Sequence, residues 1–143
     1  MPVLKKESIG KIRGGNTTKI HTLVDALGYP VKIELSAGQV SDHIFAPKLL
    51  EDLKPQIVMA TGGYDSIKFR QQIEKQGAVA CIPSHRNRKS KFPFDKVQYK
   101  ERHLVECFFK KLKRYRRIST RFDKLSCRFL AFIHLACILI WLK

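Results

Sequence analysis

Four residues suited to phosphate chemistry occur at helical offsets in one basic stretch of the chain. They are Tyr99, Arg102, Glu106 and Lys113, and the pattern around them predicts one long helix. A single carboxylate inside a basic stripe is what a metal-dependent enzyme acting on a phosphate backbone would place beside its substrate. The alternative is a surface glutamate between Arg102 and Lys110, where ion pairs contribute about 0.2–0.5 kcal/mol. Spacing alone favours this alternative.

The charge balance of the 143-residue chain indicates a polyanionic partner. Its formal net charge is +16 and its isoelectric point is near 10.0, while a hydrophobic fraction of 44% is ordinary for a globular protein. Between Arg86 and Arg128, sixteen Lys and Arg residues stand against four Asp and Glu residues. This excess favours nucleic acid or an anionic membrane as the partner. The candidate phosphate contacts are Arg86, Arg88, Lys89, Lys91, Lys110, Arg114, Arg116 and Arg117.

The elements expected to position these residues alternate between strands and helices. Residues 1–17 read as a loose basic arm. Strands over 19–26 and 31–35 form an antiparallel hairpin, because Val31, Ile33 and Leu35 alternate with charged residues. Further along come a helix from Ser41 or Asp42 to Leu53, a wholly apolar strand over 56–60 buried on both faces, a helix capped by Asp65 or Ser66 and ending at Gly77, and a strand over 78–82.

The basic C-terminal half is expected to be helical. A loop over 85–93 precedes a long helix over 95–118, and the final helix over 124–142 is apolar nearly all round, so burial is expected. His134 in that helix is then a core residue. This order of elements predicts an α/β fold with a mixed sheet, flanking helices and a helical C-terminus.

Cysteine spacing and hydropathy give the expected compartment. Four cysteines show neither a C-x-x-C pair nor zinc spacing, so reduced thiols in a cytoplasmic protein are expected, three of them buried in apolar surroundings. Met1–Gly10 lacks the apolar core of a secretory signal, and the apolar run 129–142 is short for a membrane span. The basic residues and this run occupy different helices, which argues against a membrane partner.

Several motifs together resemble a known family. The relevant segments are Arg13-Gly-Gly-Asn-Thr-Thr-Lys-Ile-His21, Val24-Asp-Ala-Leu-Gly28, Gly63-Tyr-Asp-Ser66, Arg86-Asn-Arg-Lys89, the Tyr99-Arg102-Glu106-Lys113 spacing and Arg116–Lys124. Residues 10–143 resemble the C-terminal part of a bacterial insertion-sequence transposase of the DDE class. This resemblance implies an RNase H-like fold and DNA recombination by cutting and joining at transposon ends.

The resemblance also implies a catalytic site of three carboxylates holding two Mg²⁺ or Mn²⁺ ions. Glu106 matches the third carboxylate and a metal ligand, while Tyr99, Arg102 and Lys113 match residues that orient DNA. Thr61 stands where the family has its second Asp, directly before Gly-Gly-Tyr-Asp. The first Asp belongs on a first, central strand preceding the region matched here, so that strand and its Asp are expected to be missing.

These departures lead to three hypotheses about the chain. The first is a truncated, inactive transposase remnant that binds DNA in the nucleoid, with a basic arm over 1–17 and a partial DDE domain over 18–143. The second is a binding module that occupies DNA or pairs with a full-length transposase and inhibits it. The third is one half of an enzyme whose N-terminal half is encoded separately. Thr61 counts against the third, because the joined product would still lack the second Asp.

Overall fold

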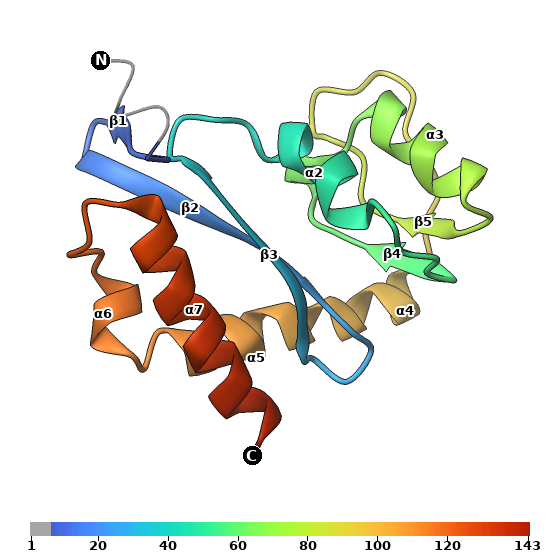
Figure 1. Ribbon diagram of the computed structural model, residues 1–143. Coiled ribbons are helices and arrows are strands. Elements are labelled where there is room, and N and C mark those ends of the chain that lie inside the picture. The colour runs from blue at the N-terminus through green and yellow to red at the C-terminus, as the bar shows by residue number, and fades with distance from the viewer. Residues whose placement is uncertain (1–6) are drawn as a thin grey trace. The chain divides into compact units, whose positions relative to one another are not determined.

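A computed structural model describes residues 7–143, which form a mixed α/β structure (Figure 1). The chain divides into two compact units. The first unit combines the described residues up to Val40 with Leu104–Lys143, and the second is Ser41–His103. The expectation for residues 1–6 lies outside the described residues.

An antiparallel sheet forms one layer of the first unit. It contains β1 (Gly10–Ile12), β2 (Gly15–Val24) and β3 (Pro30–Ala37), in that order across the sheet. The predicted hairpin is therefore confirmed, with Ile20 opposite Leu35. The loose-arm expectation is wrong for residues 10–12 and 15–17, which pair with each other as β1 and the start of β2.

A tight turn between β2 and β3 is organised by one carboxylate. Asp25 Oδ1 accepts the backbone N–H groups of Leu27 and Tyr29, each at 2.9 Å. Gly28 has φ +85°, a left-handed conformation that a residue with a Cβ adopts only with strain. Asp25 therefore has a local structural role in the turn.

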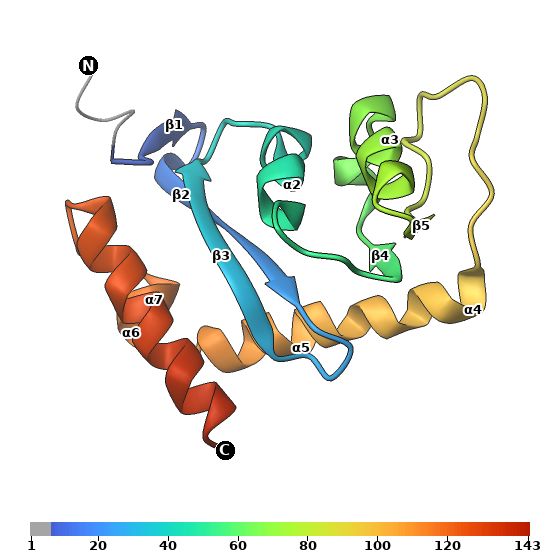
Figure 2. The same ribbon diagram turned by 45° about the vertical axis from the view of Figure 1, so that its right-hand side comes forward.

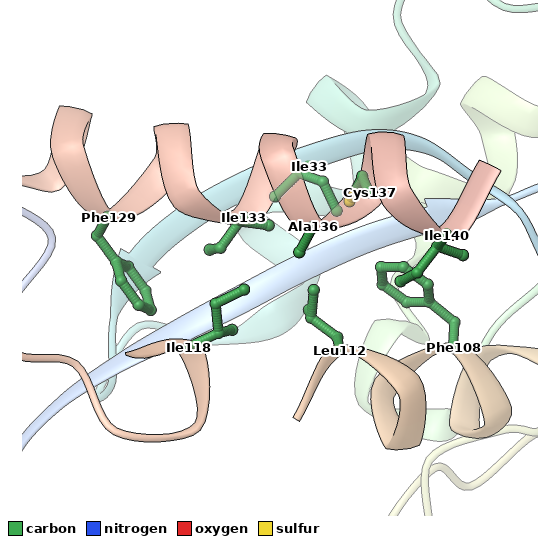
Figure 3. Packing of buried hydrophobic residues seen from close by; sticks show 9 residues of the cluster. All are labelled: Ile33, Phe108, Leu112, Ile118, Phe129, Ile133, Ala136, Cys137 and Ile140. Atoms are coloured by element: carbon green, nitrogen blue, oxygen red, sulfur yellow. The ribbon is translucent and has the colours of Figure 1, made fainter. Parts of the chain in front are cut away.

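Helices α5 (His103–Leu112), α6 (Arg116–Ser119) and α7 (Ser126–Trp141) pack with this sheet around one core (Figure 3). Phe108 and Leu112 of α5 meet Ile133 and Ile140 of α7, and Ile33 joins them from β3. All five side chains are buried. Phe108 and Leu112 are four residues apart, so they lie on one face of α5, and that face packs against the core.

The predicted long helix over 95–118 is interrupted. The structure has α4 (Lys96–Tyr99), the 3₁₀ helix η2 (Lys100–Arg102), α5, and then α6 after a break at residues 113–115. In a straight helix Ile118 would lie about 240° around the axis from Leu112, away from the buried face. The break lets Ile118 enter the same core, where its side chain is 6% exposed.

The final helix is buried on one face only, so the expectation of burial all round is wrong. Phe129, Ile133, Ala136, Cys137 and Ile140 face the core. The opposite face is apolar but exposed, and includes Leu135, Ile138 and Leu139. His134 is also exposed and is not a core residue. Within residues 7–143, no helix is long and apolar enough to cross a membrane.

The second unit is built on two parallel strands, β4 (Ile57–Met59) and β5 (Val79–Cys81). Helix α3 (Ile67–Lys75) is the crossover between them, as parallel strands require, and α2 (Asp42–Leu50) precedes β4 (Figure 2). Helix α2 ends at Leu50, before the expected Leu53, and Asp52 then adopts φ +67°. Only Val58 of β4 is buried, so burial on both faces of that strand was wrong.

Candidate nucleic-acid interface

Tyr99 and Arg102 are brought together at the end of the second unit. Asp95 begins α4 by accepting the N–H groups of Val97 and Gln98, as the sequence predicted for the start of this helix. The Arg102 guanidinium carbon lies 5.5 Å from the centroid of the Tyr99 ring, within cation–π range. Phe94 packs edge-on against the same ring, with centroids 5.3 Å apart.

Glu106 and Lys113 belong to the first unit. Glu106 lies in the first turn of α5 and is exposed. Lys113 is exposed and follows the last residue of α5, but its N–H still donates to the carbonyl of Phe109 at 2.9 Å. The backbone therefore remains helical as far as Lys113, so the seven-residue spacing from Glu106 to Lys113 corresponds to about two helical turns.

Thr61 lies in the second unit, two residues after the end of β4. It is exposed and occupies the N-cap position of the 3₁₀ helix η1 (Gly62–Tyr64), where its carbonyl accepts the N–H of Tyr64 at 3.0 Å. The carboxyl end of a parallel strand is where α/β proteins commonly place functional groups. The position is thus suited to a site residue, although a neutral hydroxyl occupies it.

The described residues do not fit a two-ion carboxylate centre. Across residues 7–143, no group of three or more His, Cys, Asp or Glu side chains is arranged to hold a metal ion. A hydroxyl such as that of Thr61 is a weak neutral ligand, whereas hard divalent cations favour carboxylates.

Burial and then the charge of Asp42 raise the pKa of nearby Tyr64 to about 12, so this phenol is a neutral group at physiological pH.

The loop after β5 is organised around the carboxylate of Asp65. Asp65 Oδ1 accepts Arg70 Nε at 2.7 Å, and Oδ2 accepts Arg88 Nε at 2.8 Å and the His85 N–H at 2.7 Å. The Asp65 side chain is 0% exposed. Burial would raise its pKa, but the His85 N–H and the two guanidinium groups outweigh burial and hold the pKa below its usual value.

This arrangement settles which residue caps α3. The Ser66 hydroxyl accepts the N–H of Phe69 at 3.1 Å, so Ser66 is the N-cap, one of the two residues predicted for that role. Asp65 instead joins α3 to the loop. Sequence reasoning missed this role because Arg88 is 23 residues away and no local pattern links it to Asp65.

Two sets of exposed cations lie among the candidate phosphate contacts, one in each unit. In the second unit, Arg86, Lys89 and Lys91 project from the loop, whereas Arg88 is engaged by Asp65. In the first unit, the set surrounds the end of α5 and α6 and consists of Lys110, Lys111, Lys113, Arg114, Arg116 and Arg117. Arg117 is partly committed, with its guanidinium carbon 3.9 Å from the centroid of the Phe132 ring and an ion pair to Asp123 at 3.3 Å.

Sequence reasoning also missed the contacts of half-buried Arg121 and buried His21. Arg121 donates to the carbonyls of Glu7 and Lys124 and to Thr18 Oγ1, which joins the connection before α7 to the start of the described chain. Burial lowers the pKa of Arg121. His21 is 2% exposed, and its Nε2 lies 2.7 Å from Ser36 Oγ across the β2–β3 pair. These contacts stabilise the first unit.

Comparisons with known proteins agree with the motifs. The family described as transposase DDE domain matches residues 5–141. A transposase for insertion sequence element IS6501 from Brucella ovis is 44% identical over 129 residues, which cover 89% of this chain and 99% of that protein. No solved structure matches the chain at a significant level. The chain therefore belongs to the transposase DDE domain family, whose members act on DNA in insertion-sequence transposition and use divalent metal ions.

Proposed function

We propose that the chain binds DNA through its two sets of exposed cations and that residues 1–143, acting alone, do not cleave it. The observation that carries the binding proposal is the exposure of nine Lys and Arg side chains in these two sets. Lys and Arg contacts to phosphates release counterions, which supplies most of the free energy of non-specific DNA binding. Binding of this kind would place the protein on chromosomal DNA in the nucleoid.

The proposed inactivity rests on Thr61. Two divalent ions, most simply Mg²⁺ or Mn²⁺, would activate the attacking oxygen and stabilise the leaving oxygen. Glu106 is the residue that would contribute a carboxylate ligand, but Thr61 offers no charge to offset two cations. The two-ion chemistry of the family needs carboxylates at both positions. We therefore propose that Glu106 keeps a catalytic carboxylate of the family and that Thr61 replaces one.

Three further residues have proposed DNA contacts. Arg102 is oriented against the ring of Tyr99, which limits the rotamers available to its guanidinium before DNA arrives. We assign Tyr99, Arg102 and Lys113 to holding the DNA end and Glu106 to the metal. Arg88 should contribute less to direct DNA contact than its neighbours Arg86 and Lys89, because its Nε–H already donates to Asp65.

We also propose that the fold is RNase H-like with its first central strand absent. Beyond Thr17, β2 pairs with β3 on one edge only, and β4 pairs with β5 on one edge only. Across residues 7–143, no other strand occupies these two edges. Open backbone ladders of this kind favour addition of another strand. Two such edges are what an RNase H-like sheet without its first strand would leave.

These edges favour a second candidate function, that of a partner for another transposase polypeptide. A strand added to β2 would pair with the backbone groups that β1 leaves open past Thr17. The added strand could come from a full-length transposase, which the pairing would inhibit, or from a separately encoded N-terminal half. Co-purification of the tagged chain with the full-length enzyme tests this candidate, and it fails if the two elute separately.

One experiment separates binding from cleavage. The purified chain is incubated with insertion-sequence-end DNA in Mg²⁺ or Mn²⁺, and nicking and complex formation are measured on the same samples. We expect complexes without nicking. Metal-dependent nicking that Glu106→Gln abolishes would overturn the proposed inactivity, whereas absence of any complex would overturn the proposed DNA binding.

A further inference from the structure

The loop between β5 and α4 has no regular secondary structure over most of its length, yet several contacts fix it (Figure 2). At its start, Arg70 Nη2 donates to the carbonyl of Ile82 at 2.7 Å. In its middle, Asp65 accepts the His85 N–H and Arg88 Nε. The contacts reach back to α3 and the residues before it, so the loop is anchored to the body of its own unit.

A second anchor closes the loop on itself. The Ser84 hydroxyl accepts the N–H of Phe92 at 2.7 Å. The Phe92 ring is contacted by two guanidinium groups, with the Arg70 and Arg88 carbons 4.3 and 5.1 Å from its centroid. Both of these arginines are also the ion-pair partners of Asp65. One buried carboxylate therefore orders both the polar and the aromatic contacts of the loop.

The side chains between these anchors are cationic and exposed. Arg86, Lys89 and Lys91 lie in the segment that Asp65, Ser84 and Phe92 enclose. Ordering a loop before it binds removes part of the conformational entropy lost on association. One cation of the loop, Arg88, is engaged by Asp65 and holds the loop in place. The fixed loop presents the other three cations together, which favours a ligand that several cations contact at once, such as a phosphate backbone.

We propose that Asp65 is a positioning residue for DNA binding, which fixes the loop so that Arg86, Lys89 and Lys91 contact the phosphate backbone together. The proposal rests on the DNA-binding function proposed above. Asp65 itself touches no DNA, and its negative charge acts on the ligand only through the loop.

The direction in which Asp65→Asn changes DNA affinity distinguishes this proposal from simple charge attraction. Asp65→Asn removes one negative charge, so simple attraction would strengthen DNA binding. The structure predicts the opposite, because an amide cannot accept from His85 and both guanidinium groups, and its NH₂ would face one of these donors. Asp52→Asn is the matched control, since it makes the same chemical change at an exposed residue of the same unit.

The experiment measures binding of the full chain to a random-sequence DNA duplex across a series of salt concentrations. Replacing Arg86, Lys89 and Lys91 by Gln removes the proposed contacts directly and should reduce the magnitude of the negative slope of log K against log salt by about 0.9 for each contact. We expect Asp65→Asn to weaken binding and reduce the magnitude of this slope toward that of the triple variant. Asp52→Asn should bind as tightly as the unmodified chain or slightly more tightly.

Combining the changes tests whether Asp65 acts through the loop. In the triple-Gln background, Asp65→Asn should have no further effect on DNA binding. Hydrogen exchange should show faster exchange at His85 in Asp65→Asn, with the β4–β5 amides still protected. Should that protection be lost, Ser84→Ala decides instead, because it releases the Phe92 anchor without breaking the buried ion pairs, and it should also reduce the magnitude of the salt slope.

Each contrary result has a distinct meaning. The proposal is overturned if Asp65→Asn, or Ser84→Ala in its place, binds with the unmodified slope, or if the loss persists undiminished in the triple-Gln background. It is also overturned if the triple variant binds like the unmodified chain, in which case the cations around α6 can still support the proposed function. A flat salt response of the unmodified chain would instead overturn the DNA-binding function itself.

Discussion

The indole N–H of Trp141 donates to the carbonyl of Pro30 at 2.9 Å, which joins the end of α7 to the beginning of β3. The Trp141 ring also stacks on Tyr29, with ring centroids 4.6 Å apart and an interplanar angle of 23°. These contacts connect two parts of the first unit that are 111 residues apart in sequence. They hold the C-terminal turn of a helix whose outer face is exposed.

Trp141→Phe should destabilise the first unit by about 1 kcal/mol, because it removes the hydrogen bond to Pro30 while keeping an aromatic ring beside Tyr29. Trp141→Leu should cost more, because the stacking is lost as well. Urea unfolding followed by circular dichroism measures both. Equal stability of Trp141→Phe and the unmodified chain would show that this hydrogen bond contributes no net stability.

The two faces of α7 should respond very differently to truncation. Ile133 is 0% exposed and Leu135 is 54% exposed on the same helix. Ile133→Ala should cost about 2–5 kcal/mol because it leaves a cavity among packed side chains. Leu135→Ala is the matched control and should change the free energy of unfolding by less than about 1 kcal/mol. A large loss at Leu135 would mean that the outer face of α7 is covered in solution.

The ion pairs of Asp65 should make stability depend on pH in the acid range. The folded-state pKa of Asp65 is lowered, so its contribution is fully present above the unfolded-state pKa of about 3.9. That contribution should be lost as pH falls from about 4 through the lower folded-state pKa. Comparing urea unfolding of the unmodified chain and Asp65→Asn at neutral and acid pH measures it. The gap between them should narrow as pH falls, and a constant gap would contradict this assignment.

The exposed and the buried cysteines should react with a thiol reagent at different rates. Cys127 is exposed, whereas Cys81 and Cys137 are buried. Burial raises the pKa of Cys137 to about 11, which keeps the reactive thiolate scarce. We expect rapid labelling of Cys127, and labelling of Cys81 and Cys137 only after unfolding. Mass spectrometry identifies the sites, and Cys127→Ser should remove the rapid phase. Rapid labelling of Cys137 would mean that α7 leaves the core readily.

Local patterns predicted much of the secondary structure. The alternation around Ile33 predicted the β2–β3 hairpin, and Gly77, at φ +75°, marked the end of α3. The break before α6 was not predictable, because it depends on Ile118 reaching a core completed by α7. Burial of α7 on every side was also overestimated, since apolar composition does not specify how many faces find partners.

The residues of the candidate site could be named from the sequence, but the contacts that hold them could not. Sequence motifs pointed to Tyr99, Arg102, Glu106 and Lys113, and their proposed roles remain predictions. The basic loop was expected, but the contacts that order it were not, because the partners of Asp65 come from α3 and from a loop 23 residues away. Long-range polar contacts of this kind leave no periodic signal in the sequence.

The central claim is that exposed cations bind the phosphate backbone of DNA. The most direct test is equilibrium binding of the purified chain to duplex DNA at salt concentrations between about 50 and 200 mM. If about six phosphates are neutralised, the affinity should fall on the order of 10³-fold over this range. An affinity that stays constant across the same range would contradict the claim.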